Sequence, residues 1–150
     1  MKLYKIHSIR TNNFKDTEML EKIQTVWQQA YHHLGEQSQT VYGVYHDYEN
    51  DYKGDYSLST AIADRYDGAV ELELPVATEY RVFEVLSANP QGVIQQWKHI
   101  WQLEEQGELS RAYTFDYEQY EPDGKITIHI ALAPALTSHE TAQSQQPASM

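Results

Sequence analysis

The sequence predicts an α+β fold in which two β-α-β-β units form one antiparallel sheet that carries two main helices. Three observations indicate it. Short runs of β-branched and aromatic residues alternate with turn-forming residues. Two longer segments place apolar residues at helical spacing. The order strand, helix, strand, strand occurs twice, over about 3–63 and 78–133. A chain of 150 residues suits one domain, which we expect to span 1–133.

We expect the first unit to begin with a strand within residues 2–14, which turns at Asn12-Asn13, and to continue with a helix that has Glu18 in its first turn. The apolar residues of that helix recur at intervals of three and four. Asp16 or Thr17 provides an N-cap, and Gly35 ends the helix.

Strands over 40–48 and 56–63 complete the first unit, with a polar turn over 49–55 between them. A strand over 69–76 follows, in which apolar and acidic residues alternate and Pro75 stands near the end, a pattern that suits an edge or a half-buried strand.

The second unit repeats this order. A strand over 78–86 leads into a helix that Asn89 caps, with Pro90 at the first helical position, and Gly107 ends the helix. A β-hairpin over 111–133 follows, turning at Pro122-Asp123-Gly124. The remaining residues, 134–150, have no periodicity and predict a disordered tail.

Composition limits the class of protein. The absence of Cys excludes disulfides and thiolate chemistry, and the 7 His show no zinc-ligand spacing, so we expect no cofactor. A net charge of -11 argues against nucleic acid as a partner and favours cations. No apolar run approaches the ~20 residues of a membrane span, and the first residues do not form a signal peptide. We therefore expect a soluble, cytoplasmic protein without a membrane partner.

Alternation along the hairpin decides which residues share a face of the sheet. It places Glu118 on one face with Asp116 and Tyr120, and by the repeat with Tyr45. The other face carries aromatic residues that we expect to pack on a helix: Tyr113, Phe115 and Tyr117. Glu118 is thus a carboxylate that faces a cavity or solvent.

Local matches support the repeat. Trp27 and Tyr31 in the first helix correspond to Trp97 and Trp101 in the second. The tripeptide at 47–49 corresponds to the one at 116–118, although Glu49 begins a polar turn and is expected to be solvated. Two such units pair their strands in one sheet, and the seam between them is a natural place for a ligand pocket.

Three stretches carry a family resemblance: residues 41–62, the strand over 80–86 with the helix after it, and residues 112–132. Their order resembles the gyrase-inhibitor-like effector-binding domain, which also forms the ligand-sensing half of AraC- and MerR-type regulators. The chain is most similar to the stand-alone, integron-associated members. The resemblance implies an aromatic pocket with a central Glu that binds lipophilic, often cationic compounds.

The resemblance assigns the ligand-binding residues. The central Glu maps onto Glu118, and the pocket aromatics map onto Tyr45, Trp97, Trp101 and Tyr113. Strand alternation weakens the assignment of Tyr113 unless a bulge resets the register. A carboxylate there would select charge, while the aromatic faces would tolerate varied shapes.

The leading hypothesis is an effector-binding protein that senses or sequesters amphipathic cations, as multidrug-binding domains do, and is not an enzyme. No helix-turn-helix is evident, so transcription regulation would need a partner regulator or a homodimer. The alternative is a hydrolase of reactive small molecules in which Glu118 acts as general base. A weaker possibility is gyrase inhibition through the acidic surface.

Overall fold

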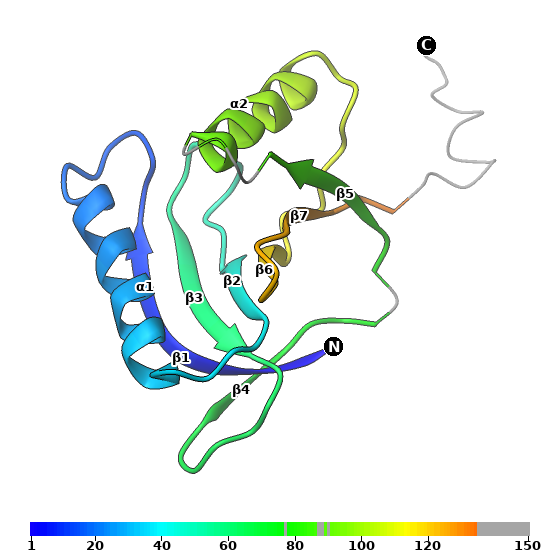
Figure 1. Cartoon of the computed structure of the whole chain (residues 1–150). Coiled ribbons are helices and arrows are strands. Elements are labelled where there is room, and N and C mark those ends of the chain that lie inside the picture. Colours follow the sequence, from blue (N-terminus) through cyan, green and yellow to red (C-terminus); the bar gives the residue numbers. More distant parts are fainter. Residues whose placement is uncertain (77, 87–88, 90, 135–150) are drawn as a thin grey trace.

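A computed structural model describes residues 1–76, 78–86, 89 and 91–134 of the chain (Figure 1). The described residues form two helices and seven strands, in the order β1 (Lys2–Thr11), α1 (Met19–Leu34), β2 (Val41–His46), β3 (Tyr56–Ile62), β4 (Val70–Glu73), β5 (Tyr80–Val85), α2 (Gly92–Glu105), β6 (Asp116–Tyr120) and β7 (Ile126–Ala131). None of the helices among these residues is long and apolar enough to cross a membrane.

The strands form one antiparallel sheet in the order β4-β1-β3-β2-β6-β7-β5. The three strands of the first unit, β1-β3-β2, are followed by those of the second in reversed order, β6-β7-β5. The two units therefore meet where β2 pairs with β6, and β4 is added outside β1. This arrangement confirms the predicted α+β fold, the duplicated unit and the edge position of the fourth strand.

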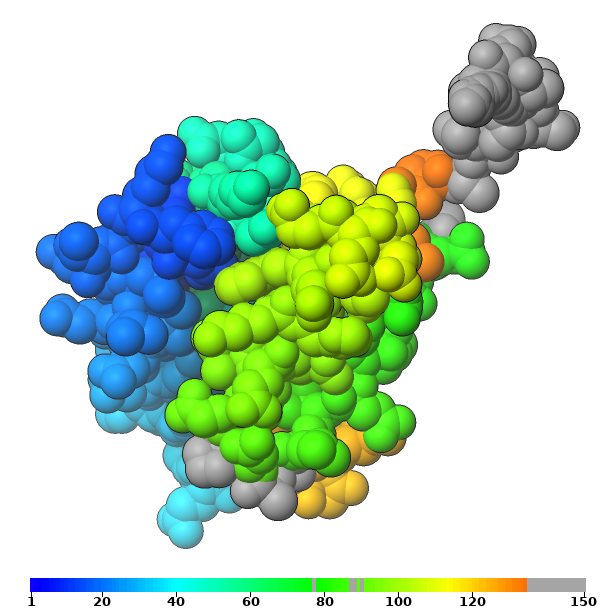
Figure 2. All heavy atoms as spheres, turned by 90° about the horizontal axis from the view of Figure 1, so that it is seen from above, coloured from blue at the N-terminus to red at the C-terminus, as the bar shows by residue number. Residues whose placement is uncertain are grey.

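Each helix packs on the half of the sheet that belongs to its own unit. Val26 of α1 lies in a buried cluster with Tyr56 and Leu58 of β3. In the second unit, Ile100 of α2 lies in a buried cluster with Ile128 of β7. Seen from above, the surfaces of the two helices lie side by side, with the turn after β2 next to them at one end (Figure 2).

The opposite face of the sheet has its own core, made of Leu3, Val44, Ala61, Leu72, Leu74 and Tyr117. Tyr117 was expected to pack on a helix, and that expectation is wrong. Leu72 and Leu74, from β4 and the residue just after it, cover this face instead. Glu118, its neighbour in the strand, consequently points toward the helices.

Most predicted element ends agree with the structure. Asp16 Oδ1 accepts the backbone N–H of Glu18 at 2.9 Å just before α1, and Gly35 follows the helix with a φ of 60°. In the last hairpin, Gly124 has a φ of 94°, the left-handed conformation that glycine adopts without strain. Gly35 and Gly124 act as the sequence predicted, whereas the N-cap position is held by Glu18, so Asp16 lies in the turn before the helix and the N-cap prediction is wrong.

The start of α2 differs from the prediction. The helix begins at Gly92 with Gln91 at the N-cap position, two residues later than expected. Asn89 Oδ1 accepts the N–H of Gln91 at 2.9 Å, and its carbonyl accepts the N–H of Gly92, so this residue closes a turn before the helix. Pro90 lies outside the described residues, as does the predicted tail after Pro134.

The repeated tripeptide is a coincidence of sequence. Residues 116–118 lie inside β6, whereas residues 47–49 follow the end of β2. In the duplicated fold β6 corresponds to β2, and the two strands pair with Val44 opposite Tyr117. Residues 116–118 therefore correspond to residues within β2 and not to residues 47–49. As predicted, Glu49 is exposed.

Candidate functional site

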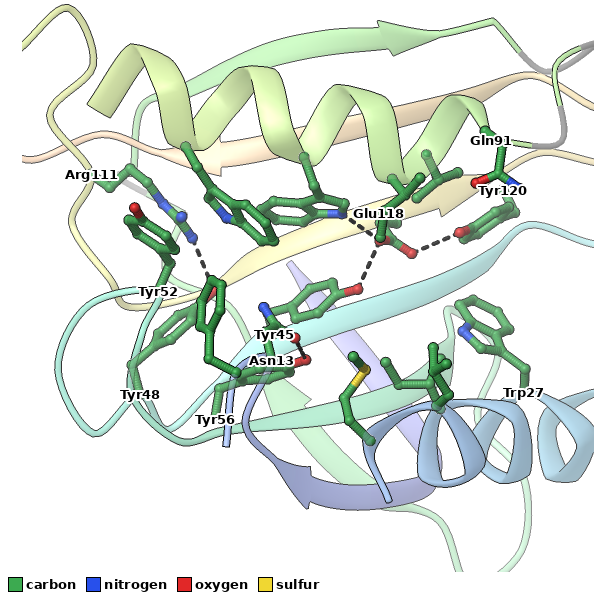
Figure 3. Close-up of a pocket in the computed structure, with 18 residues that line it drawn as sticks. Asn13, Trp27, Tyr45, Tyr48, Tyr52, Tyr56, Gln91, Arg111, Glu118 and Tyr120 are labelled. Atoms are coloured by element: carbon green, nitrogen blue, oxygen red, sulfur yellow. Dashed lines mark hydrogen bonds between the residues drawn. The ribbon is translucent and has the colours of Figure 1, made fainter. Parts of the chain in front are cut away.

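A cavity of about 440 Å³ lies where the two units meet (Figure 3). Helix α1 contributes one wall and helix α2 the other, and the strands of the seam form the floor. The lining is mostly aromatic and aliphatic, with Met19, Leu20, Ile23 and Trp27 from α1, Val93, Ile94, Trp97 and Trp101 from α2, and Tyr45, Tyr56, Glu118 and Tyr120 from the strands. A cavity of this size and composition suits a small, largely apolar molecule.

Glu118 lies on the floor of this cavity and is only 2% exposed. Its carboxylate accepts three hydrogen bonds (Figure 3). The Tyr45 hydroxyl and the Trp97 indole N–H donate to Oε2 at 2.8 and 2.7 Å, and the Tyr120 hydroxyl donates to Oε1 at 2.7 Å. All three partners act as donors, which suits an ionised carboxylate because that group only accepts.

Burial raises the pKa of the Glu118 carboxyl above its ordinary value, although the bonds from Tyr120, Trp97 and Tyr45 act in the opposite direction. Burial and the neighbouring carboxylate also raise the pKa values of Tyr45 and Tyr120, so both hydroxyls keep their protons. The site therefore holds a carboxylate whose charge is incompletely compensated.

Gly43 on β2 leaves space for the side chain of Trp27 from α1. It pairs with Glu118 across the seam, and a Cβ at this position would lie 2.8 Å from Cζ2 of Trp27. Without a side chain there, the indole of Trp27 can lie over β2 and reach Tyr120, with ring centroids 4.8 Å apart. The repeat matched Trp27 with Trp97, and the structure brings both to the same cavity.

The structure brings four of the five sequence-predicted residues to the cavity. Tyr45 and Trp97 bond to Glu118, while Trp101 lines the wall further along and stacks on Tyr52, with centroids 5.2 Å apart. Tyr113 does not line it. Tyr113 precedes β6 in a left-handed conformation with a φ of 55°, so strand alternation does not reach it.

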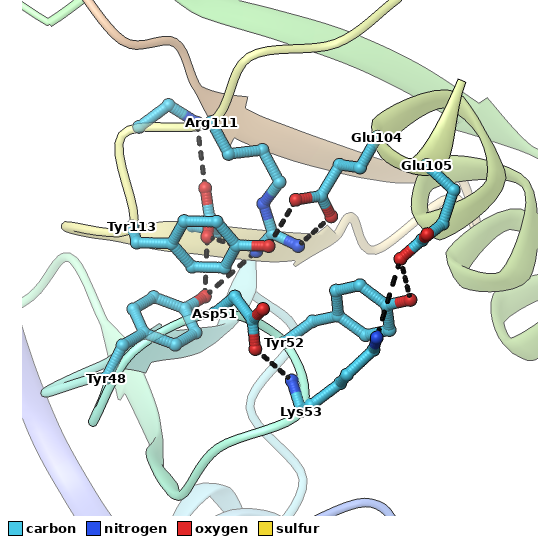
Figure 4. Close-up of polar contacts among 10 residues, drawn as sticks. Tyr48, Asp51, Tyr52, Lys53, Glu104, Glu105, Arg111 and Tyr113 are labelled. Carbon is cyan, nitrogen blue, oxygen red and sulfur yellow. Dashed lines mark hydrogen bonds and ion pairs between the residues drawn. The ribbon is translucent and has the colours of Figure 1, made fainter. Parts of the chain in front are cut away.

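Arg111 borders the cavity at the end away from Trp27 and Tyr120 (Figure 3). Its side chain is 1% exposed and pairs with two carboxylates, Asp116 at 2.7 Å and Glu104 at 3.0 Å. The Tyr48 hydroxyl accepts from the same guanidinium at 3.3 Å and donates to Asp116 (Figure 4).

Tyr113 completes this network, since its hydroxyl donates to Glu104 and its ring centroid lies 4.3 Å from Cζ of Arg111. Burial alone would lower the pKa of Arg111, but Asp116 and the tyrosines beside it raise that pKa. The guanidinium is thus a fixed charge. No pattern in the sequence indicated Arg111, because its partners are brought together only by the fold.

The turn after β2 contacts the end of α2 beside the cavity (Figure 4). The Tyr52 hydroxyl donates to Glu105 at 2.7 Å, and Lys53 Nζ lies 3.7 Å from the same carboxylate. Phe14, which also lines the cavity and is 57% exposed, packs on Trp101 with ring centroids 5.8 Å apart. The described residues contain no group of three His, Asp or Glu side chains that could hold a metal ion.

Comparisons with known proteins agree with this fold. The model of the Cass2 family, described as integron-associated effector binding protein, matches residues 4–132. The crystal structure of the integron cassette protein VCH_CASS2, from the mobile metagenome of Vibrio cholerae, is 26% identical, with a TM-score of 0.70 over 89% of this chain and 90% of that one. SAV2435, solved bound to tetraphenylphosphonium, is 16% identical, with a TM-score of 0.64 over 97% and 94%. No curated protein matches the sequence.

Proposed function

The chain belongs to the Cass2 family of integron-associated effector-binding proteins, and from this premise we propose that it binds lipophilic cations in the cavity between its two units. Glu118 would select the positive charge, and the aromatic walls would accept varied shapes. The proposed role is that of a sensor or sequestering module, which passes its ligand state to a partner regulator or to a second copy of the chain.

The observation that carries the proposal is the environment of Glu118. A carboxylate that is 2% exposed loses most of its hydration, and burial raises its pKa. A bound cation would restore favourable electrostatics to that carboxylate. The faces of Trp97, Trp27 and Tyr45 would each add a cation–π attraction of roughly 0.5–2 kcal/mol.

One relative of the same fold is known with a bound cation. SAV2435 shares the fold and was solved with a lipophilic cation. At 16% identity, this likeness concerns the fold alone. The argument for a cation in this chain therefore rests on its own carboxylate and aromatic side chains.

A matched pair of ligands tests the proposal. Methyltriphenylphosphonium carries a charge, and 1,1,1-triphenylethane has the same shape without it. Calorimetric titration and quenching of tryptophan fluorescence should show binding of the cation and weaker binding of the neutral compound. Binding of neither compound, or equal binding of both, would overturn the proposal.

The alternative is hydrolysis of a reactive small molecule. A carboxyl group with a raised pKa, next to tyrosine hydroxyls in an apolar cavity, also suits a general base. Turnover of an epoxide or an activated ester, lost on the change Glu118→Gln, would favour this alternative. Saturable cation binding without turnover would favour the effector-binding function.

A further inference from the structure

A second hollow, of about 210 Å³, adjoins the cavity at Tyr120, the one residue that lines both. Tyr120 and Trp27 lie at the end of the cavity opposite to Arg111 (Figure 3). The second hollow is lined by the last turn of α1, the loop after it, the start of β2 and the end of β6. It therefore lies at the seam between the two units, as the cavity does.

Helix α1 runs beside both spaces. Its lining residues recur at intervals of three or four: Leu20, Ile23 and Trp27 beside the cavity, then Tyr31 and Leu34 beside the second hollow. This spacing places them along one face of the helix. On the sheet, Val41 lines the second hollow and pairs directly with Tyr120. The second hollow is therefore a continuation of the cavity along α1.

The rings of Trp27 and Tyr120 mark the boundary between the two spaces. They meet edge to face, with centroids 4.8 Å apart. The ring of Tyr31 follows, with its centroid 6.0 Å from that of Trp27. Trp27 and Tyr120 are only partly buried, and Tyr31 is 57% exposed. All three side chains thus present aromatic surface on which a flexible apolar chain can lie.

Glu118 lies next to this boundary, because its Oε1 accepts the hydroxyl of Tyr120 at 2.7 Å. A chain attached to a cation at Glu118 therefore has only the Tyr120 ring to cross before it enters the second hollow. There it would meet the side chains of Leu34, Val41 and Pro122, which suit an alkyl group. Among the residues that line the second hollow, Glu121 alone is charged, and it would repel an anionic chain end.

We propose that the second hollow is a binding subsite for an uncharged alkyl chain carried by the cation. This inference rests on the proposed function, because it assumes that Glu118 receives the positive charge. It narrows the ligand class to amphiphiles in which one cationic head bears a long unbranched chain.

The first test is a series of alkyltriphenylphosphonium ions that runs from methyl through butyl and hexyl to octyl and decyl. In calorimetric titrations of the wild-type protein, affinity should rise about two- to fourfold for each methylene group that becomes buried. Equal affinity along the series would overturn the inference, while binding of the methyl compound would still support the proposed function. Binding of no member would overturn both.

The variant Tyr31→Ala tests the second hollow itself, since it removes an exposed ring that lines this space and not the cavity. The ratio of octyl to methyl affinity should fall about threefold or more. Taking the ratio within each protein cancels any general loss of affinity. His32→Ala is the matched control, because His32 is also exposed and lines neither space. An unchanged ratio in Tyr31→Ala, or an equal fall in both variants, would contradict the inference.

A measurement on the wild-type chain locates the alkyl group directly. The probe is a decyltriphenylphosphonium with a diazirine at the end of its chain, which is bound, irradiated and mapped by mass spectrometry. Attachment within residues 31–41 or 120–122 is expected. Attachment at Phe14, Tyr52 or Trp101, which line the other part of the cavity, would overturn the inference and leave the proposed function standing.

Discussion

Gly43 and Glu118 lie opposite each other on β2 and β6, the two strands that join the halves of the sheet. The missing side chain of Gly43 admits the indole of Trp27 from α1, while Trp97 from α2 bonds to the carboxylate of Glu118. Each unit thus supplies one strand and one tryptophan. The site exists only where the two units meet.

The close approach of Trp27 to Gly43 predicts the effect of a single methyl group. In Gly43→Ala the added Cβ would meet the Trp27 ring at 2.8 Å, so this ring, which lines the cavity, must shift. We expect a loss of about 1 kcal/mol in unfolding free energy and weaker binding of methyltriphenylphosphonium.

The second change Trp27→Phe removes the ring atoms that clash, so it should restore part of both losses. A double-mutant cycle of thermal and calorimetric measurements checks this coupling. If the losses caused by Gly43→Ala and Trp27→Phe simply add in the double variant, the methyl group does not act through the ring of Trp27.

The hydroxyl of Tyr45 stabilises the charged form of Glu118 through its 2.8 Å hydrogen bond. Tyr45→Phe should raise the pKa of Glu118 further and weaken cation binding by about tenfold or more, since a hydrogen bond to a charged group contributes about 1.5–3 kcal/mol. Calorimetry at fixed pH measures the change. Tyr42→Phe is the matched control, because Tyr42 lies on the same strand and contacts Tyr117 on the opposite face. A similar loss in both variants would contradict the role of the hydrogen bond.

The raised pKa of Glu118 predicts a pH dependence of cation affinity. The ordinary value is 4.5, and burial in the folded protein raises it. Between 4.5 and the raised value, the folded protein holds a proton that the unfolded chain has lost, so the stability contributed by this group falls as the pH rises. A cation favours the ionised form, so its affinity should rise through the same window and then level off.

Calorimetry in buffers of different ionisation enthalpy should detect proton release on cation binding within that window. The variant Glu118→Gln, titrated over the same pH series, lacks the proton release from Glu118. Its pH profile therefore measures the protons that other groups release. His46 and His129, whose pKa values burial lowers, are among those groups. A wild-type affinity with the same pH profile as the variant would contradict the assignment to Glu118.

The contact between Tyr52 and Glu105 predicts an effect on binding kinetics. Tyr52 stacks on Trp101 at one side of the cavity, and burial together with Glu105 raises its pKa to about 12, so its hydroxyl remains a donor at neutral pH. Tyr52→Ala should open this side and speed both association and dissociation of methyltriphenylphosphonium. Tyr52→Phe keeps the stacked ring and should have a smaller effect. Stopped-flow fluorescence measures both rates, and unchanged rates in the alanine variant would show that ligands enter elsewhere.

Local patterns in the sequence predicted most elements of this fold. The end of the first helix at Gly35 and the turn at Gly124 follow from residues close to them in the chain. Alternation along the hairpin, together with the internal repeat, also placed Glu118 and Tyr45 on one face, and their hydrogen bond confirms it. These features depend on residues that lie close together in the chain or at a regular interval along it, so the sequence alone reveals them.

Features that depend on the pairing of distant strands could not be predicted in this way. The space at Gly43 is decided by a helix that packs across the strand, and the partners of Arg111 come from α2, β6 and the turn after β2. The covering of Tyr117 by Leu72 was missed for the same reason. The sequence shows these residues, but their proximity arises only from the order of strands in the sheet.

The central claim is that the buried carboxylate of Glu118 selects cations. The most direct measurement is a calorimetric comparison of the wild-type protein and Glu118→Gln, each titrated with methyltriphenylphosphonium and 1,1,1-triphenylethane. We predict that the variant binds the cation at least about tenfold more weakly and binds the neutral compound as well as the wild-type protein does. Undiminished binding of the cation by Glu118→Gln would contradict the claim.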